Sequence, residues 1–424
     1  MTTLDHSRST ALATGLKLTT AATLMGLVLV GCATSAPSNS ADPGETDAPH
    51  SEAPHGYVEG ASEAAEPQVA AVFLAQNGEI TSLDLLSEQE ETVEADAEIV
   101  QWSSDRRYAA FLTAEGAVQL YDSGRWSVDH EDHMHFYRAT PRTVEVPLAV
   151  DDVETLAEDG LWISSSERAV VVGVRGGATL VLDAKALGQG ETDVLATLEE
   201  SPGEQLTVPL GEHLVQASTE DASIEIFALD GSPIETLAQS CTNVASASQT
   251  PVGVVFSCDE GAVTVAASEK VPSASLTPMP DSASEPAGAF AGRSGRPTLA
   301  ASNADGVWLF QSRSEAWTLV PTELQFSRVF AVDDTRHSVI GVTVDNEFAV
   351  VNGETGATVG VTETLLADSS ATRPSSIELI ATADRAYLFG PSEQQLWEID
   401  FRDDARIART FETPADSEFM VAGL

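Results

Sequence analysis

The chain has 424 residues, of which 66 are Asp or Glu and 21 are Lys or Arg, so its formal charge at pH 7 is −45. A surface this acidic repels phosphate backbones, which excludes nucleic acid as a partner. It attracts cations diffusely and without a specific site, so the charge alone does not indicate metal binding.

The first 31 residues have the pattern of a lipoprotein signal peptide. Two basic residues, Arg8 and Lys17, precede an apolar stretch at residues 19–30, and Leu29-Val30-Gly31-Cys32 resembles a lipobox. A transmembrane helix is the weaker alternative, because about 20 apolar residues are needed to span a bilayer. We therefore expect lipidation of Cys32 and an extracytoplasmic protein, lipid-anchored to the outer face of the cell membrane.

Residues 32–67 have the composition of a linker. The segment after Cys32 is rich in Ala, Ser, Pro and Gly and contains seven acidic residues but no Lys or Arg. Such a segment buries too little apolar area to offset the entropy lost on ordering, which predicts a flexible acidic tether. It contains His50 and His55.

From residue 68 to residue 424 the sequence repeats one unit, in which an apolar strand, a tight turn and a second apolar strand follow each other. The intervals between successive turns are 38, 61, 44, 40, 45, 40 and 46 residues. The eight turns are centred on Gly78, Gly116, Gly177, Asp221, Gly261, Gly306, Asn346 and Ser392.

A period of about 40 to 45 residues is typical of β-propeller blades. We therefore predict an all-β, eight-bladed β-propeller over residues 68–424, with a pair of β-sandwiches as the alternative. Several units carry an arginine in the polar turn before the first strand of the pair, as in Ser104-Asp105-Arg106, Ser166-Glu167-Arg168 and Ala383-Asp384-Arg385.

The interval of 61 residues contains "SVDHEDHMHFYRA" at residues 127–139, with three of the eight histidines of the chain, His130, His133 and His135. We expect this stretch on an insertion or extended loop between the second and third units. Alternate side chains of a strand share a face, so His133 and His135 can point the same way while His130 approaches from the preceding turn.

Three neutral imidazoles, with Asp129, Asp132 or another histidine as the fourth ligand, suit zinc first and copper or nickel next. Imidazole binds a metal only when deprotonated, so affinity is expected to fall below about pH 6. The alternative is a solvated polar loop.

The sequence lacks the motifs of an enzyme. His130 and His133 are three residues apart, whereas the metalloprotease helix needs His-Glu-x-x-His with a spacing of four. A quinone- or sugar-dependent propeller enzyme would need a cofactor motif that is absent here. We therefore expect no enzymatic activity.

Two cysteines, Cys241 and Cys258, remain after Cys32 is assigned to the lipid. Outside the cytoplasm such a pair is expected to form a disulfide. A two-thiolate metal site is the weaker alternative, because no histidine is near either cysteine in the sequence.

Four stretches of the chain resemble the AztD-type zinc metallochaperones. They are "HGYVEGASEAAEPQ" from His55, "DHMHFYRA" from Asp132, "VVFSCDEGAV" around Cys258, and the closing "DRAYLFGPSEQQLWEIDFRDDARIARTF". The resemblance implies an extracytoplasmic eight-bladed propeller that holds zinc and delivers it to the solute-binding protein of a zinc ABC importer. It also implies that His130, His133, His135 and His55 are metal ligands.

The chain departs from that family pattern at three positions where further histidines are expected. They are occupied by Glu204 before "LTVPLG", Ala245 after Cys241, and Trp397 before "EID". Glu204 can still bind a metal and stays a candidate ligand, whereas Ala245 and Trp397 cannot.

Two functions follow from these observations. The leading hypothesis is a monomeric, non-catalytic lipoprotein that buffers zinc and passes it to an importer's binding protein. The alternative is a cell-surface propeller without metal, a protein-interaction scaffold whose acidic face docks a basic partner and whose association is salt-sensitive.

Overall fold

The computed structural model describes residues 56–130, 133–156, 160–199, 205–219, 221–268, 270–367 and 377–424. These residues form antiparallel β-sheets, together with one short helix, α1 (Ala184–Gln189), and one 3₁₀ turn, Val153–Thr155. The prediction of an all-β chain is confirmed. Within the same ranges, no helix is long and apolar enough to cross a bilayer. The expected signal peptide, Cys32 and the first part of the expected tether lie outside the described residues.

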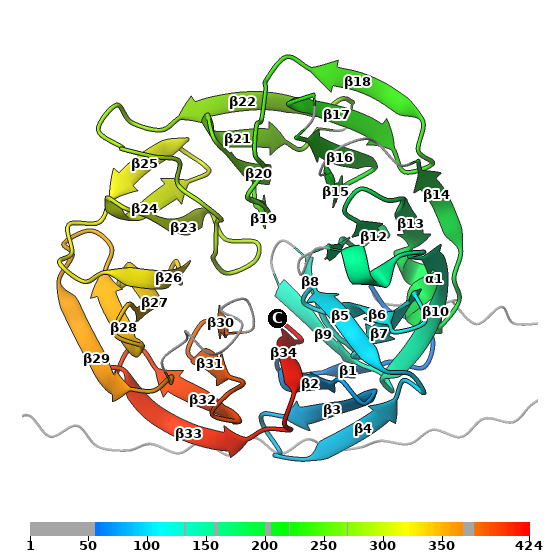
Figure 1. The fold of residues 1–424 in the computed structure, drawn as a ribbon, viewed down its shortest axis with the longest axis horizontal. Helices are drawn as coiled ribbons and strands as arrows, with labels where there is room; N and C mark the ends of the chain where they lie inside the picture. Colours follow the sequence, from blue (N-terminus) through cyan, green and yellow to red (C-terminus); the bar gives the residue numbers. More distant parts are fainter. Residues whose placement is uncertain are drawn as a thin grey trace, which may run out of the picture. The chain divides into compact units, whose positions relative to one another are not determined.

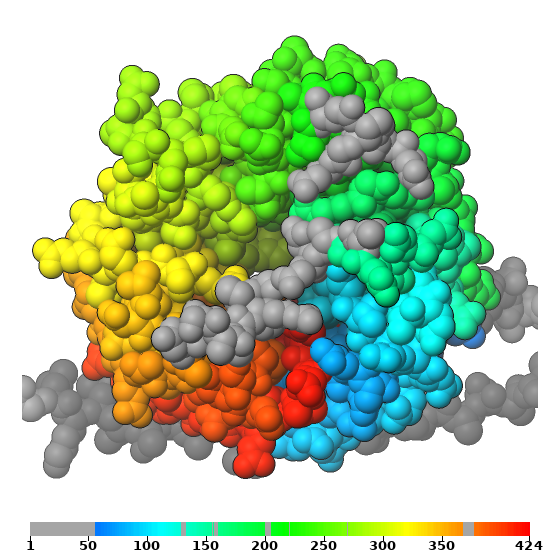
Figure 2. Space-filling model, in the orientation of Figure 1, coloured from blue at the N-terminus to red at the C-terminus, as the bar shows by residue number. Residues whose placement is uncertain are grey.

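The described strands form nine sheets, and eight of them follow one another around a ring (Figure 1). The space-filling view shows the same face, hollowed at the centre of the ring (Figure 2). The first four sheets are β34-β2-β3-β4 (Ser417–Ala422, Ala70–Ala75, Glu79–Asp84, Glu90–Glu94), β10-β7-β6-β5 (Arg142–Ala149, Ala117–Asp122, Tyr108–Thr113, Ile99–Ser104), β11-β12-β13-β14 (Leu161–Ser165, Ala169–Val174, Thr179–Asp183, Val194–Leu198) and β15-β16-β17-β18 (Gln205–Leu210, His213–Ser218, Ser223–Ala228, Pro233–Leu237).

The other four sheets complete the propeller. They are β19-β20-β21-β22 (Ser246–Thr250, Gly253–Cys258, Gly261–Ala266, Ser273–Pro278), β23-β24-β25 (Thr298–Asn303, Gly306–Gln311, Ala316–Leu319), β26-β27-β28-β29 (Phe326–Ala331, Ser338–Thr343, Glu347–Asn352, Thr358–Thr364) and β30-β31-β32-β33 (Glu378–Ala381, Ala386–Gly390, Gln395–Asp400, Arg406–Glu412).

Each repeat turn identified in the sequence joins two neighbouring strands of one of these sheets. Gly78, for example, lies between β2 and β3 with a φ of 91°, and a Cβ there would collide with the carbonyl of Ala97. The apolar strands on either side of the turns are buried on both faces, because neighbouring sheets pack against each other. The repeat in the sequence is therefore the repeat of the fold, and the β-sandwich alternative is wrong.

The ring is closed by the last strand of the chain. β34 pairs with β2 from Ala70↔Ala422 to Ala75↔Ser417, so both ends of the propeller domain share one sheet. Phe419 of β34 lies 5.6 Å from Phe73 and 5.3 Å from Phe389, measured between ring centroids, which joins this sheet to β31. Closing the ring in this way covers the sheet edges that an open array of blades would expose.

The ninth sheet is the insertion predicted from the long repeat interval. It consists of β8 (Arg125–His130), β9 (His133–Arg138) and β1 (Ser62–Ala64), in the order β1-β9-β8. The insertion lies within the second unit, between β7 and β10, and not between the second and third units as the sequence suggests. The reason is that β10 returns to pair with β7, starting at Arg142↔Asp122, and completes the second sheet after the hairpin.

The described structure begins before residue 68, where the propeller domain is expected to start. β1 belongs to the segment assigned by composition to the tether, and Val58 in the same segment is buried. The composition of this segment does not indicate that it is ordered, because the apolar contacts and the pairing strand come from the hairpin β8–β9.

One carboxyl group at the inner edge of the ring makes folding sensitive to pH. Burial raises the pKa of Glu378, on β30, to about 7; the neighbouring Glu418 on β34 adds to the rise and Arg328 opposes it. A carboxyl whose pKa is raised in the folded state stabilises the fold at low pH only. This contribution is lost as the pH rises from the ordinary value of 4.5 through about 7.

We expect Glu378→Gln to raise the free energy of unfolding at pH 8 by up to about 3 kcal/mol, because the amide needs no proton to stay neutral. The same substitution should flatten the dependence of stability on pH between 5 and 8. Denaturant unfolding at several pH values measures both effects, with Glu363→Gln, an exposed position, as the control. Equal stability of wild type and Glu378→Gln at pH 8 would contradict the assignment.

Candidate metal centre

The hairpin β8–β9 brings the predicted histidines onto one strand pair. Its register places His130 opposite His133, Val128 opposite His135 and Trp126 opposite Tyr137. Alternate residues of β9 share a face, so His133, His135 and Tyr137 lie on the same side of the hairpin.

The two described histidines of the cluster contact each other through their ring nitrogens. The Nε2 atoms of His133 and His135 are 3.0 Å apart, and the ring centroids are 4.6 Å apart. The Nδ1 atom of His135 lies 2.7 Å from Oε1 of Glu63, a residue of β1 that stands opposite Tyr137 in the register. The three side chains form one chain of contacts across two strands.

The contact with Glu63 decides which nitrogen of His135 carries the proton. A carboxylate accepts a hydrogen bond, so Nδ1 is the protonated nitrogen and Nε2 has a lone pair. That lone pair faces Nε2 of His133. Two imidazole nitrogens bound to one tetrahedral zinc, at about 2.05 Å each, lie about 3.3 Å apart, which is close to the separation observed here. In the metal-free chain Nε2–H of His133 donates to this lone pair, and a cation bound by both rings would take the place of that proton.

A cluster of aromatic and aliphatic residues fixes the face of the hairpin that carries the histidines. Trp126 stacks on Tyr137, with ring centroids 5.2 Å apart, and Tyr57 meets the edge of Tyr137 at 6.5 Å. The guanidinium of Arg107 lies 3.9 Å from the centroid of the Trp126 ring. Burial, together with the carboxylate of Glu63, raises the pKa of Tyr137. These contacts hold the segment with β1 against the hairpin and so position Glu63.

Gly56 anchors the start of this segment close to the histidines. Its carbonyl accepts a hydrogen bond of 3.1 Å from Nε1 of Trp126. Its φ is 74°, and a Cβ would collide with the side chain of Val128, the residue opposite His135. Only glycine fits this close approach. The next residue toward the N-terminus is His55, which lies outside the described residues.

The structure therefore brings together two of the predicted ligands, His133 and His135. His135 has a side chain 15% exposed, and His133 is exposed, so the pair can be reached from solvent. His130 takes the register position opposite His133. Asp132, His55 and Glu204 lie outside the described residues. Among the residues that are described, no group of three or more His, Cys, Asp or Glu side chains is arranged to hold a metal.

Glu63 is the residue of the candidate site that sequence reasoning missed. It lies in the segment assigned to the tether, 72 residues before His135, and only the pairing of β1 with β9 brings the two together. No periodicity or spacing in the sequence indicates a strand pairing of this kind.

The remaining candidate positions are structural. The structure pairs Cys241 with Cys258 through their sulfur atoms, with Cα atoms 5.1 Å apart. Trp397, a residue of β32, is buried in the apolar cluster that this blade shares with β27 and β28. His213 is buried in β16, and Nε2 of His337 lies 3.3 Å from Oε1 of Glu354, so both belong to the blades and not to the hairpin.

The fold is similar to that of solved structures at low sequence identity. No protein-family model and no curated protein matches the sequence. AztD from Citrobacter koseri superimposes with a TM-score of 0.66 at 14% identity, covering 84% of this chain and 98% of AztD. The apo form of the same protein gives 0.66 at 13% identity, over the same shares of the two chains. The chain therefore has an AztD-like propeller fold.

An enzyme is also among the similar structures. The dihydro-heme d1 dehydrogenase NirN gives a TM-score of 0.52 at 15% identity and covers 85% of this chain and 76% of NirN. The propeller fold therefore neither implies nor excludes catalysis, and function must be argued from the site.

We expect Glu63→Ala to change the tautomer of His135. In the wild type at pH 8 the proton should reside on Nδ1, held by the carboxylate, and in the variant the Nε2–H form should become the major one. Long-range ¹H–¹⁵N correlation spectra of the imidazole rings distinguish the two forms. Glu59→Ala, an exposed acidic position of the same segment, is the control and should leave the spectrum unchanged. An Nε2–H tautomer in the wild type would refute the hydrogen-bonding scheme.

Proposed function

We propose that the hairpin β8–β9 binds zinc and that the chain is an extracytoplasmic zinc metallochaperone. The observation that carries the proposal is the facing pair of Nε2 atoms, 3.0 Å apart, with one ring oriented by Glu63. A carboxylate behind a ligating imidazole is the usual outer partner of zinc-binding histidines, where it fixes the ring and raises its basicity.

The ligand set in this proposal starts from His133 and His135. His130 supplies the third imidazole, in keeping with its position opposite His133 in the register. The fourth position of a tetrahedral ion is left to His55, which directly precedes the anchored Gly56, or to Asp132 or a water molecule. A set of neutral imidazoles with a carboxylate behind it favours zinc over the hard cations Mg²⁺ and Ca²⁺, which prefer oxygen ligands.

The position of the histidine pair supports delivery of zinc rather than its permanent retention. The two histidines stand on an added hairpin and not inside the packed blades, and one of them is exposed. A partner can therefore replace the ligands one at a time, without opening the propeller core. The excess of 66 acidic over 21 basic residues adds a diffuse attraction that raises the local concentration of cations.

The partner in this proposal is the solute-binding protein of a zinc ABC importer, and the place is the outer face of the membrane. The AztD-like fold and the four stretches of sequence that resemble the AztD-type metallochaperones support both parts. The lipid anchor at Cys32 keeps the carrier beside an importer in the same membrane.

Competition titration against a zinc-chelating dye tests metal binding. The wild type should bind zinc more tightly than micromolar, Glu63→Ala should weaken binding about tenfold or more, and His133→Ala or His135→Ala by still more, because a direct ligand is lost. His337→Ala removes an exposed histidine of a blade and is the matched control. No binding tighter than micromolar, or an equal affinity of wild type and His133→Ala/His135→Ala, would remove the proposal.

Stopped-flow mixing of the zinc-loaded chain with the apo solute-binding protein tests delivery. Direct transfer predicts a rate that rises with acceptor concentration and exceeds the rate of zinc loss to a small chelator that only captures free zinc. If the rate of zinc transfer did not depend on the acceptor concentration, the chain would be a zinc buffer and would have no role in delivery. Association with a partner that is unaffected by chelators and weakened by salt would instead favour the scaffold function.

A further inference from the structure

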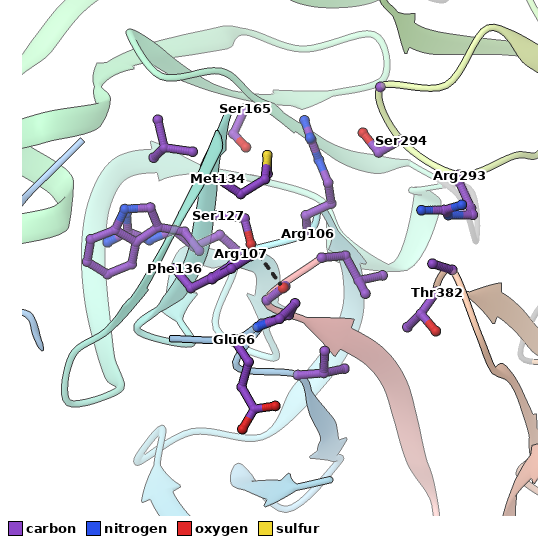
Figure 3. A pocket seen from close by; sticks show the side chains of 18 of the residues that line it. Glu66, Arg106, Arg107, Ser127, Met134, Phe136, Ser165, Arg293, Ser294 and Thr382 are labelled. Carbon is purple, nitrogen blue, oxygen red and sulfur yellow. Dashed lines mark hydrogen bonds between the residues drawn. The ribbon is translucent and has the colours of Figure 1, made fainter. Parts of the chain in front are cut away.

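A large cavity opens at the centre of the ring, at one end of the innermost strands. It has a volume of about 1400 Å³ and is lined by the residues that follow β5, β11, β30 and β34, by the loop before β23, and by the hairpin β8–β9 (Figure 3). Met134 and Phe136, which alternate with the two histidines along β9, belong to its wall. His133 and His135 do not line it.

The charge of the cavity wall is opposite to that of the protein. Among the residues that the structure describes, eight Lys and Arg side chains but only four Asp and Glu side chains line the cavity, although acidic residues outnumber basic ones 66 to 21 in the whole chain. The arginines of three repeat turns, Arg106, Arg168 and Arg385, are among them, because these turns lie at the same end of the second, third and eighth blades. The eight basic residues are Arg106, Arg107, Arg168, Lys185, Arg293, Arg296, Arg385 and Arg409.

Most of these arginines already have carboxylate partners in the wall or behind it. Their guanidinium groups lie 2.8 to 3.1 Å from carboxylate oxygens. The pairs are Arg107–Asp122, Arg168–Glu212, Arg296–Asp333, Arg385–Asp400 and Arg409–Glu88. They are part of the fold and leave little positive charge for a ligand.

Arg106 and Arg293 are different. The guanidinium of Arg106 donates to Oε1 of Gln249 at 2.8 Å, and its nearest carboxylate is that of the adjacent Asp105 at 3.5 Å. Arg293 donates to the carbonyl of Val332 at 3.3 Å and forms no ion pair with any residue that the structure describes. A guanidinium has five N–H donors, so both groups have donors left for a ligand.

Arg293 is also in an unfavourable environment for a cation. Burial and the nearby guanidinium of Arg296 lower the pKa of Arg293, and the carboxylates at positions 333, 334 and 384 offset this only in part. An oxyanion placed beside it would add to this compensation, since pairing stabilises a partly buried charge.

The surroundings of the two arginines show what kind of anion fits. In Figure 3, Arg293 lies with Ser294 and Thr382 on one side of the cavity, Met134 and Phe136 lie with Ser165 on the other, and Arg106 stands between the two groups. Guanidinium and hydroxyl groups are donors to oxyanions, whereas the thioether and the ring offer an apolar surface. Arginine has no lone pair for a metal, so this cavity and the zinc site select different ligands.

We propose that the central cavity binds a small amphipathic organic anion. Its carboxylate, phosphate or sulfonate group is held by Arg106 and Arg293, and its apolar part packs against Met134 and Phe136. The proposal does not depend on zinc binding at the hairpin.

Fluorescence titration with 8-anilinonaphthalene-1-sulfonate, which joins an oxyanion to fused rings, tests the proposal. We expect saturable binding at one site and competition by citrate or inorganic phosphate. Arg293→Gln should weaken probe binding about tenfold or more, consistent with the loss of a charge-assisted hydrogen bond. The control Arg313→Gln, which removes an exposed arginine outside the cavity, should leave it unchanged. Competition by citrate but not by phosphate would assign the site to carboxylates, and the reverse to phosphates.

A second variant distinguishes a loss of binding from a loss of folding. Ser294→Asp adds a negative charge next to Arg293 and should also weaken binding about tenfold, while Ser314→Asp should not. Thermal unfolding curves identify any variant that is not folded. Binding without saturation, or an equal loss in Arg313→Gln and Ser314→Asp, would overturn the proposal.

Discussion

The hydrogen bond between Glu63 and His135 connects the start of the domain to the hairpin inserted in its second blade. It spans 2.7 Å and follows from the pairing of β1 with β9, which places Glu63 beside the strand of the histidines. Without this contact either nitrogen of the His135 ring could carry the proton. With it, the lone pair of Nε2 is directed at His133, and a pair of ordinary surface histidines becomes a candidate metal centre.

The propeller supplies the rigidity that this centre needs. Its sheets are buried on both faces and closed by β34, so the blade that carries the hairpin is fixed at β7 and β10 on either side of the insertion. The two proposed sites share one strand. Along β9, the histidines alternate with Met134 and Phe136, which line the arginine-rich cavity at the centre of the ring. The fold is common to unrelated functions, and the specific chemistry lies in what is added to it.

The sequence predicts the fold well because each blade repeats one local pattern. The turns at Gly78 and the seven equivalent positions mark hairpins that depend on neighbouring residues only. The histidine pair is predictable for the same reason, since alternation along a strand is local. Glu63 and the cavity are not, because both depend on contacts between distant segments. Arg106 and Arg293 come from different blades and line one cavity, and no spacing between them in the sequence indicates this.

X-ray absorption at the zinc K-edge of the metal-loaded chain tests the central claim most directly. The account predicts at least two imidazole rings bound through nitrogen at about 2.0 Å, with their multiple-scattering signal absent from the His133→Ala/His135→Ala double variant. A spectrum with oxygen ligands only, or one that the double substitution leaves unchanged, would show that the metal is held by the acidic surface and not by the hairpin.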